Sequence, residues 1–143
     1  MKTVAQILGE RSGSIIKVGP GESVHHALEI MAQHGVGAVL VMEHGRLVGI
    51  LSERDYARKV VLKGRISETT RVRDIMSPRV ICATLPMTLE HAMALTSEHN
   101  IRHLPVLDDA KEVVGVISIR DLVKGIIVDQ SFVIEQLEHY IAA

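Results

Sequence analysis

The sequence predicts an α/β fold built from two consecutive β-α-β-β-α units and a C-terminal amphipathic helix. Three observations lead to this prediction. The chain contains an internal duplication, each copy alternates short apolar runs with segments of helical periodicity, and residues 129–143 place apolar side chains at helical spacing after the second copy. A chain of 143 residues is long enough for one compact domain or for two small halves that share a core.

The duplication is clearest in a seven-residue segment. Residues 49–55, Gly-Ile-Leu-Ser-Glu-Arg-Asp, recur as residues 115–121, Gly-Val-Ile-Ser-Ile-Arg-Asp. Upstream, Ser23–Leu28 aligns with Thr88–Met93. The shift is 65 residues, and it becomes 66 after one extra residue in the turn Asp108–Lys111. Matches in this order and at a nearly constant spacing indicate two copies of one structural unit.

Each copy begins in the same way. A short apolar run, Ile15–Val18 or Val80–Ala83, predicts a first strand. Next comes a helix whose N-cap is Ser23 in the first copy and Thr88 in the second, with apolar residues repeating at helical spacing behind each cap.

A hairpin and a second helix complete each copy. The predicted strands are Ala38–Met42 with Leu47–Leu51, and Leu104–Leu107 with Val113–Ile117. The segments between them, Glu43–Arg46 and Asp108–Lys111, have turn composition. The second helices start at Ser52 and Ser118, and the polar stretch Lys63–Arg71 joins the copies.

The tail has no counterpart after the first copy. Its side chains at helical spacing are Phe132, Val133, Gln136, Leu137, Tyr140 and Ile141. They predict a helix with one apolar stripe, which needs a surface to cover it. Packing against the protein's own repeats is one solution, and a homodimer is the other.

These residues resemble a family, the CBS domain pair or Bateman module. Both copies carry its signature, Gly, two apolar residues, Ser, two residues and Asp. Arg102–Val106 resembles the family's basic-Leu-Pro-Val start of the middle strand, and Val4–Leu8 and Val72–Ser77 resemble its lead-in segments. The resemblance covers the chain to about Val128. It divides the chain into repeat one at 1–66, repeat two at 67–128 and the C-terminal helix at 129–143, together one Bateman module.

The resemblance implies a function. In this family two repeats pack about a pseudo-twofold axis, and the clefts between them hold AMP, ADP, ATP, NAD or S-adenosylmethionine. Pairs commonly dimerise into a disk and regulate a neighbouring enzyme or transporter. We therefore expect a non-catalytic sensor of adenine nucleotides that forms a homodimer and acts on an unidentified protein effector. The alternative is a structural dimerisation or scaffold module without a physiological nucleotide.

The expected nucleotide-binding residues lie where the last strand of each copy turns into a helix: Ser52, Arg54, Asp55, Ser118, Arg120 and Asp121. Serine and arginine suit a phosphate at a helix start, and the aspartate suits the ribose hydroxyls. Ser-x-x-Asp is also a capping box, and the two roles can coexist. Arg102 and His103 are further candidates for a phosphate contact, and for His103 a surface role is the alternative.

Composition excludes several other functions. A net charge of −1 with Tyr 2, Phe 1 and Trp 0 argues against a nucleic-acid partner. No apolar run has the length of a membrane span. Cys82 is the one cysteine, which favours a cytoplasmic location and an inert thiol. The histidines recur by duplication rather than as a cluster, so we expect no metal site, and no base is placed to make a catalytic serine.

Overall fold

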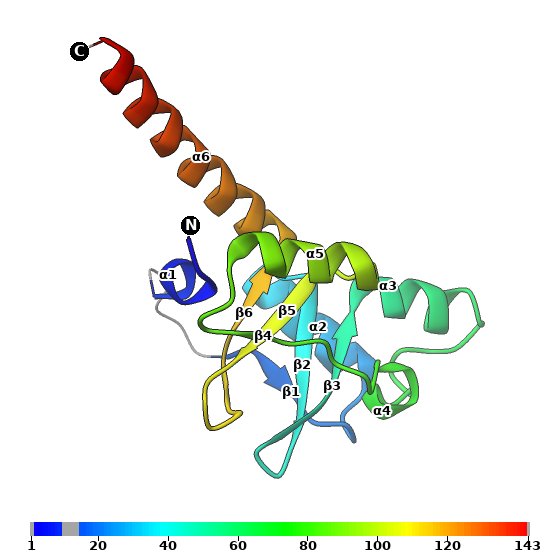
Figure 1. Cartoon of the computed structure of the whole chain (residues 1–143). Helices are drawn as coiled ribbons and strands as arrows, with labels where there is room; N and C mark the ends of the chain where they lie inside the picture. Colours follow the sequence, from blue (N-terminus) through cyan, green and yellow to red (C-terminus); the bar gives the residue numbers. More distant parts are fainter. Residues whose placement is uncertain (1, 10–14, 143) are drawn as a thin grey trace. The chain divides into compact units, whose positions relative to one another are not determined.

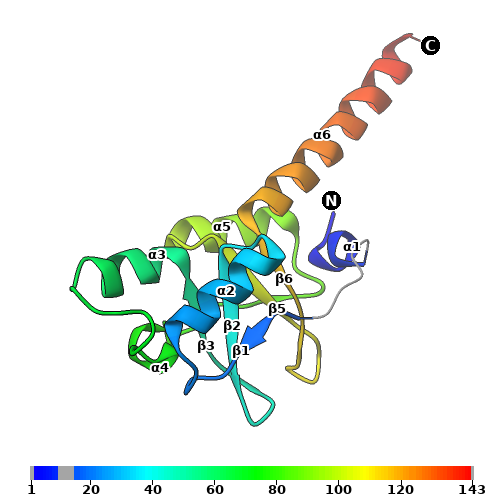
Figure 2. The same cartoon turned by 180° about the vertical axis from the view of Figure 1, so that it is seen from behind.

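A computed structural model describes residues 2–9 and 15–142, and the side chains of 140–142 lie outside the description (Figures 1 and 2). The chain divides into two compact units. We call Ile15–Val80 the repeat-one unit, and Met1–Ser14 together with Ile81–Ala143 the repeat-two unit.

The repeat-one unit is a three-stranded sheet with helices. Its elements are β1 Lys17–Val18, α2 Val24–His34, β2 Ala38–Glu43, β3 Arg46–Ser52, α3 Glu53–Tyr56, the π-helix η1 Ala57–Val61, and α4 Val72–Ile75. The strand order is β1-β2-β3, with β1 parallel and β3 antiparallel to β2.

The repeat-two unit has the same plan. Its elements are α1 Val4–Leu8, β4 Ala83–Thr84, α5 Leu89–His99, β5 His103–Leu107, β6 Val113–Ser118 and α6 Ile119–Ala142. The order β4-β5-β6 repeats the parallel and antiparallel pairings of the first sheet. Two β-α-β-β-α units and a C-terminal helix are therefore confirmed, although the first strand of each unit is shorter than its apolar run.

Local chemistry explains the helix ends. The Ser23 hydroxyl accepts a hydrogen bond from the His26 N–H, and the Thr88 hydroxyl accepts one from His91, each at 3.1 Å. The first of these helices stops at Gly35, with φ 63°, in the left-handed conformation typical of a helix C-terminus.

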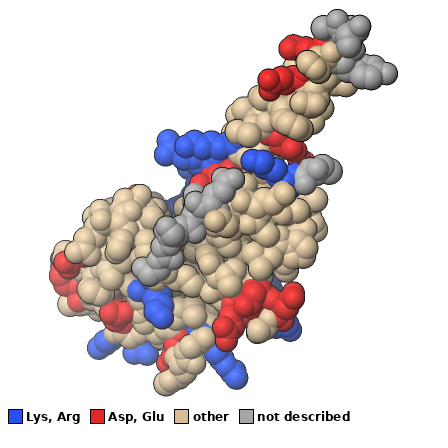
Figure 3. All heavy atoms as spheres, turned by 90° about the vertical axis from the view of Figure 1, so that its left-hand side faces the viewer, with Lys and Arg blue, Asp and Glu red and all other residues tan. Residues whose placement is uncertain are grey.

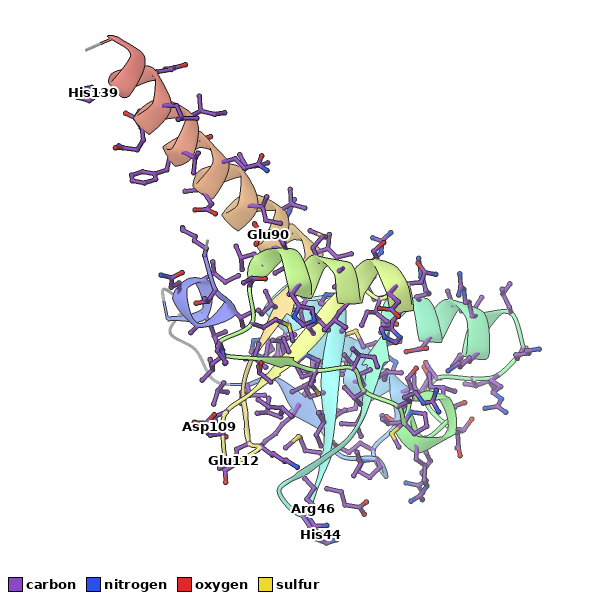
Figure 4. The ribbon with its side chains drawn as sticks, in the orientation of Figure 1. His44, Arg46, Glu90, Asp109, Glu112 and His139 are labelled. Atoms are coloured by element: carbon purple, nitrogen blue, oxygen red, sulfur yellow. The ribbon has the colours of Figure 1, made fainter. Side chains whose placement is uncertain are left out.

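The two hairpins have exposed tips (Figure 4). His44 and Gly45 adopt positive φ values of 52° and 76° between β2 and β3, as a tight hairpin turn requires. The Asp108 carboxylate accepts hydrogen bonds from the backbone of Ala110 and Glu112, each at 2.9 Å. Both turns were predicted from composition. Each turn joins two antiparallel strands, β2 with β3 and β5 with β6.

Each unit has its own core, and each contains the lead-in helix that precedes the other repeat in the sequence. In the repeat-two unit, the Val4 N–H donates to the Met87 carbonyl at 2.8 Å, and α1 packs beside β4. A Cβ on Gly115 would lie 2.6 Å from Leu8 Cδ1. In the repeat-one unit, a Cβ on Gly49 would lie 2.7 Å from Met76 Sδ. In each unit the signature glycine, Gly115 or Gly49, therefore leaves room for a side chain from the lead-in segment, Leu8 or Met76 respectively.

The last helix differs from the sequence interpretation. We expected a repeat helix and a separate tail helix, whereas α6 is one helix of 24 residues. In the first copy the chain turns at Gly64, with φ 68°, soon after η1. The corresponding position in the second copy is Gln130, which lets the helix continue.

Candidate functional site

The predicted site residues of the second copy meet at one corner of the repeat-two unit. His103, the first residue of β5, pairs with Ser118, the last residue of β6. The Ile119 N–H donates to the Arg102 carbonyl at 2.9 Å, so the start of α6 lies beside the start of β5. Arg102 and Arg120 are exposed, and His103, Ser118 and Asp121 are half-buried.

The first copy repeats this geometry with smaller residues. Ala38 pairs with Ser52, and the Glu53 N–H donates to the Gly37 carbonyl at 3.0 Å. Gly37 and Ala38 therefore take the places of Arg102 and His103, and the corner lacks their side chains. Arg54 is exposed and Asp55 is half-buried, like their counterparts in the second copy.

The serine and aspartate of each motif form a complete capping box. The Asp55 N–H donates to Ser52 Oγ at 3.2 Å, while the Ser52 N–H and hydroxyl donate to Asp55 Oδ2 at 2.9 and 3.0 Å. Ser118 and Asp121 repeat these bonds at 3.2, 2.8 and 2.9 Å. The structural role predicted for the motif is present in both copies, and it fixes the position of each carboxylate.

A further contact is seen at Asp55. Lys59 Nζ lies 3.3 Å from Asp55 Oδ1 and donates a hydrogen bond to the Ile75 carbonyl at 2.9 Å. Glycine occupies the position of Lys59 in the second copy, at Gly125. A Cβ on Gly125 would lie 2.6 Å from Leu89 Cδ1, so this position packs closely against α5.

A pocket of about 270 Å³ opens beside Asp121 within the repeat-two unit. It is lined by residues of β6, α6, α1 and the chain before α1: Lys2, Ile7, Leu8, Ile117, Asp121, Lys124, Gly125 and Val128. Its walls are mostly apolar, with one acid and two lysines. Basic side chains also gather near the base of the projecting part of α6 (Figure 3).

Of the eight predicted site residues, Asp121 is the one that lines this pocket. The sequence analysis did not identify Lys2, Ile7 and Leu8 as site residues. No feature of the residues around α1 indicates that this helix packs in the repeat-two unit. Lys124 could have been found, since it follows Asp121 by three residues on the same helix.

Within residues 2–9 and 15–142, no three His, Cys, Asp or Glu side chains come close enough to hold a metal ion. None of the helices described there has the length and apolar character needed to cross a membrane. Burial raises the pKa of the Cys82 thiol, which disfavours the reactive thiolate.

The comparisons with known proteins agree with the duplication. A family model described as CBS domain matches residues 6–62 and again residues 72–128. A mitochondrial CBS domain-containing protein of Arabidopsis thaliana is 37% identical over 134 residues, which are 90% of this chain and 65% of that protein. The chain therefore spans just under two thirds of the length of that relative.

Solved structures share the fold over most of the chain. A signal-transduction protein with CBS domains from Burkholderia ambifaria has a TM-score of 0.86 and 45% identity, covering 90% of this chain and 96% of that one. A CBS domain pair in complex with 5′-methylthioadenosine and S-adenosyl-L-methionine has a TM-score of 0.75 and 29% identity, covering 86% and 94%.

Proposed function

The chain belongs to the CBS domain family, and from this premise we propose that it is a non-catalytic regulatory module that binds an adenine nucleotide. The observation that carries the proposal is the pocket beside Asp121, which combines apolar walls with an acid and two lysines. A related CBS pair binds two adenosine compounds, which supports the same class of ligand.

Each part of an adenine nucleotide has matching chemistry in this unit. Ile7, Leu8 and Ile117 offer apolar contact to the base. The Asp121 carboxylate is an acceptor for ribose hydroxyls, as an acidic residue is in dinucleotide folds. Lys2 and Lys124 offer charged hydrogen bonds to a phosphate. The neighbouring corner adds Arg102, His103, Ser118 and Arg120 as proposed phosphate contacts.

The charge and the size of the pocket narrow the choice of nucleotide. Two lysines favour phosphorylated adenosine compounds over a sulfonium compound, because a fixed cation repels the lysine ammonium groups. A volume of about 270 Å³ lies just below the range of about 300–1,000 Å³ that is typical of ligand pockets. We therefore place AMP ahead of ADP, ATP and NAD as the ligand of this pocket.

The ligand can be identified directly. Protein purified without added nucleotide is heated, and the released small molecules are analysed by mass spectrometry. We expect an adenosine phosphate, enriched over the same treatment of the Asp121→Asn variant. Release of a guanine or pyrimidine nucleotide in its place would refute the proposed ligand class.

The exposed part of α6 supports self-association as an accompanying role. At about 100° per residue, Ile126, Ile127, Val133, Ile134 and Leu137 fall within an arc of about 120°. Ile127, Ile134 and Leu137 remain 57%, 55% and 56% exposed. Phe132 and Gln136, which the sequence interpretation put on this stripe, lie outside this arc. The side chains of Tyr140 and Ile141 lie outside the described residues.

The charged residues beside this stripe favour α6 of a second protein chain as its partner. Lys124 and Glu138 flank the same edge of it, near its beginning and its end. In an antiparallel pair each lysine would lie beside the partner's glutamate, whereas a parallel pair offers no such match. We propose an antiparallel homodimer through α6. This is also the observation that favours the alternative function, a dimerisation scaffold.

A further inference from the structure

One turn of the repeat-one unit exposes three large apolar side chains to solvent. Val61, Leu62 and Ile66 are 54%, 77% and 60% exposed. They lie within six residues of one another, where the chain leaves η1 and enters the segment that joins the two copies. Exposed apolar side chains that gather in one place mark a contact surface.

The backbone holds this turn in a defined conformation. The Arg65 N–H donates to the Val60 carbonyl at 2.9 Å, and Gly64 has a φ of 68°, as in the Schellman motif that ends many helices. Beyond the glycine, the hydroxyl of the buried Thr70 donates to the Ile66 carbonyl at 2.7 Å. The apolar side chains are therefore presented to solvent by a hydrogen-bonded backbone.

Cations surround these apolar side chains. Arg58, Lys63 and Arg65 are exposed, and no Asp or Glu occurs in residues 56–67. We call residues 58–66 the basic turn. The repeat-one unit contains ten Lys or Arg and seven Asp or Glu, a net charge of +3, whereas the rest of the chain contains six and ten, a net charge of −4. The charge of −1 for the whole chain conceals this separation, which makes the repeat-one unit attractive to an anionic surface.

The second copy keeps the apolar side chains but not the cations. Its residues at the three matching apolar positions are also exposed: Ile127, Val128 and Phe132. Asp129 and Ser131, however, take the places of Lys63 and Arg65. The combination of apolar and basic side chains therefore belongs to the first copy alone and is not a consequence of the duplicated fold.

The position of the basic turn favours a bilayer over a peptide as its partner. Figures 1 and 2 show the turn at the end of the helix formed by α3 and η1, directed away from the sheet of the repeat-one unit. Peptides bind in grooves or along the edges of sheets. A projecting turn with apolar and basic side chains instead suits the bilayer interface, where apolar groups insert and Lys and Arg contact anionic headgroups.

We propose that the basic turn attaches the protein to the surface of an anionic bilayer. The three aliphatic side chains enter the boundary between headgroups and acyl chains, and the three cations contact the headgroups. The turn lies on the bilayer and does not span it. This role is separate from nucleotide binding and goes beyond the proposed function.

The test is sedimentation of the full chain with vesicles of phosphatidylcholine, or of phosphatidylcholine mixed with the anionic lipid phosphatidylglycerol. We expect binding to the mixed vesicles and much weaker binding to the neutral ones. Lys63→Glu should weaken binding more than about fivefold, because each cation near an anionic surface contributes about that factor. Leu62→Ser should weaken it about tenfold, because an inserted leucine is lost. Thermal unfolding confirms that each variant is folded.

Arg46→Glu is the matched control for the change of charge. Arg46 is exposed beside the tip of the β2–β3 hairpin of the same unit, so its replacement changes the charge of the unit equally and leaves the basic turn intact (Figure 4). It should bind the mixed vesicles more tightly than Lys63→Glu does, at close to the wild-type affinity.

Three results would overturn the proposal. The first is a wild-type chain that does not bind the mixed vesicles. The second is an equal loss of binding in Lys63→Glu and Arg46→Glu, which would leave the basic turn without a special role. The third is a smaller particle for Leu62→Ser than for the wild type in light scattering, which would show that the turn contacts a second protein chain instead of lipid.

Discussion

Replacing Asp121 with asparagine is expected to weaken AMP binding by about ten- to a hundredfold, as loss of a charge-assisted hydrogen bond does. The fold should survive, because an asparagine oxygen can still accept the hydrogen bond that the Ser118 N–H donates to Asp121 at 2.8 Å. Calorimetric titration of AMP measures the change, and thermal unfolding confirms that the variant is folded.

Asp55→Asn is the matched control for this prediction. It makes the same chemical change in the capping box of the first copy, whose residues do not line the pocket beside Asp121. Its AMP affinity should equal that of the wild type. If Asp121→Asn also binds AMP as the wild type does, the ribose is not held at Asp121.

Replacing Ile134 with glutamate is expected to abolish the homodimer at micromolar concentration. Ile134 lies in the middle of the α6 stripe and is 55% exposed in the single chain, so the change should not disturb the core. Fully burying such a side chain gains about 1.5–3 kcal/mol, and a symmetric dimer contains it twice. The loss of about 3–6 kcal/mol corresponds to at least a hundredfold weaker association.

Light scattering of the wild type, Ile134→Glu and Gln136→Glu measures whether each protein is a monomer or a dimer. Gln136 is exposed and lies about 160° around α6 from Ile134, so its replacement adds the same charge outside the stripe. We expect a dimer for the wild type and Gln136→Glu and a monomer for Ile134→Glu. A wild-type particle of 15.7 kDa would refute the dimer, and a dimeric Ile134→Glu protein would place the interface elsewhere.

The parts of the fold that could be predicted depend on nearby residues. Ser23 and Thr88 cap helices because a hydroxyl can reach an N–H three residues later, and His44-Gly45 turns a hairpin because both residues tolerate positive φ. Because the chain is duplicated, a pattern recognised in one copy could be checked against the other copy. The capping role of Ser-x-x-Asp followed from the same kind of local pattern.

What could not be predicted depends on distant contacts. Helix α1 has five residues, and its sequence does not say which sheet will receive Leu8. Leu8 packs at Gly115, which is more than a hundred residues away in the sequence. The absence of a Cβ on Gly115 leaves room for the Leu8 side chain. The pocket residues before β1 were missed for this reason. The Asp55–Lys59 pair is different, because its spacing of four residues on a helix could have been recognised.

The central claim, that this CBS protein binds adenine nucleotides, is tested most directly by thermal unfolding of the wild-type chain with AMP, ADP, ATP, NAD, GMP and CMP. A ligand at a hundredfold excess over its dissociation constant stabilises the folded state by about 2.7 kcal/mol. For a chain of this length the melting temperature should rise by about 5–10 °C. We predict this rise for AMP and a smaller one for GMP and CMP. An unchanged melting temperature with all four adenine nucleotides at millimolar concentration would contradict the claim.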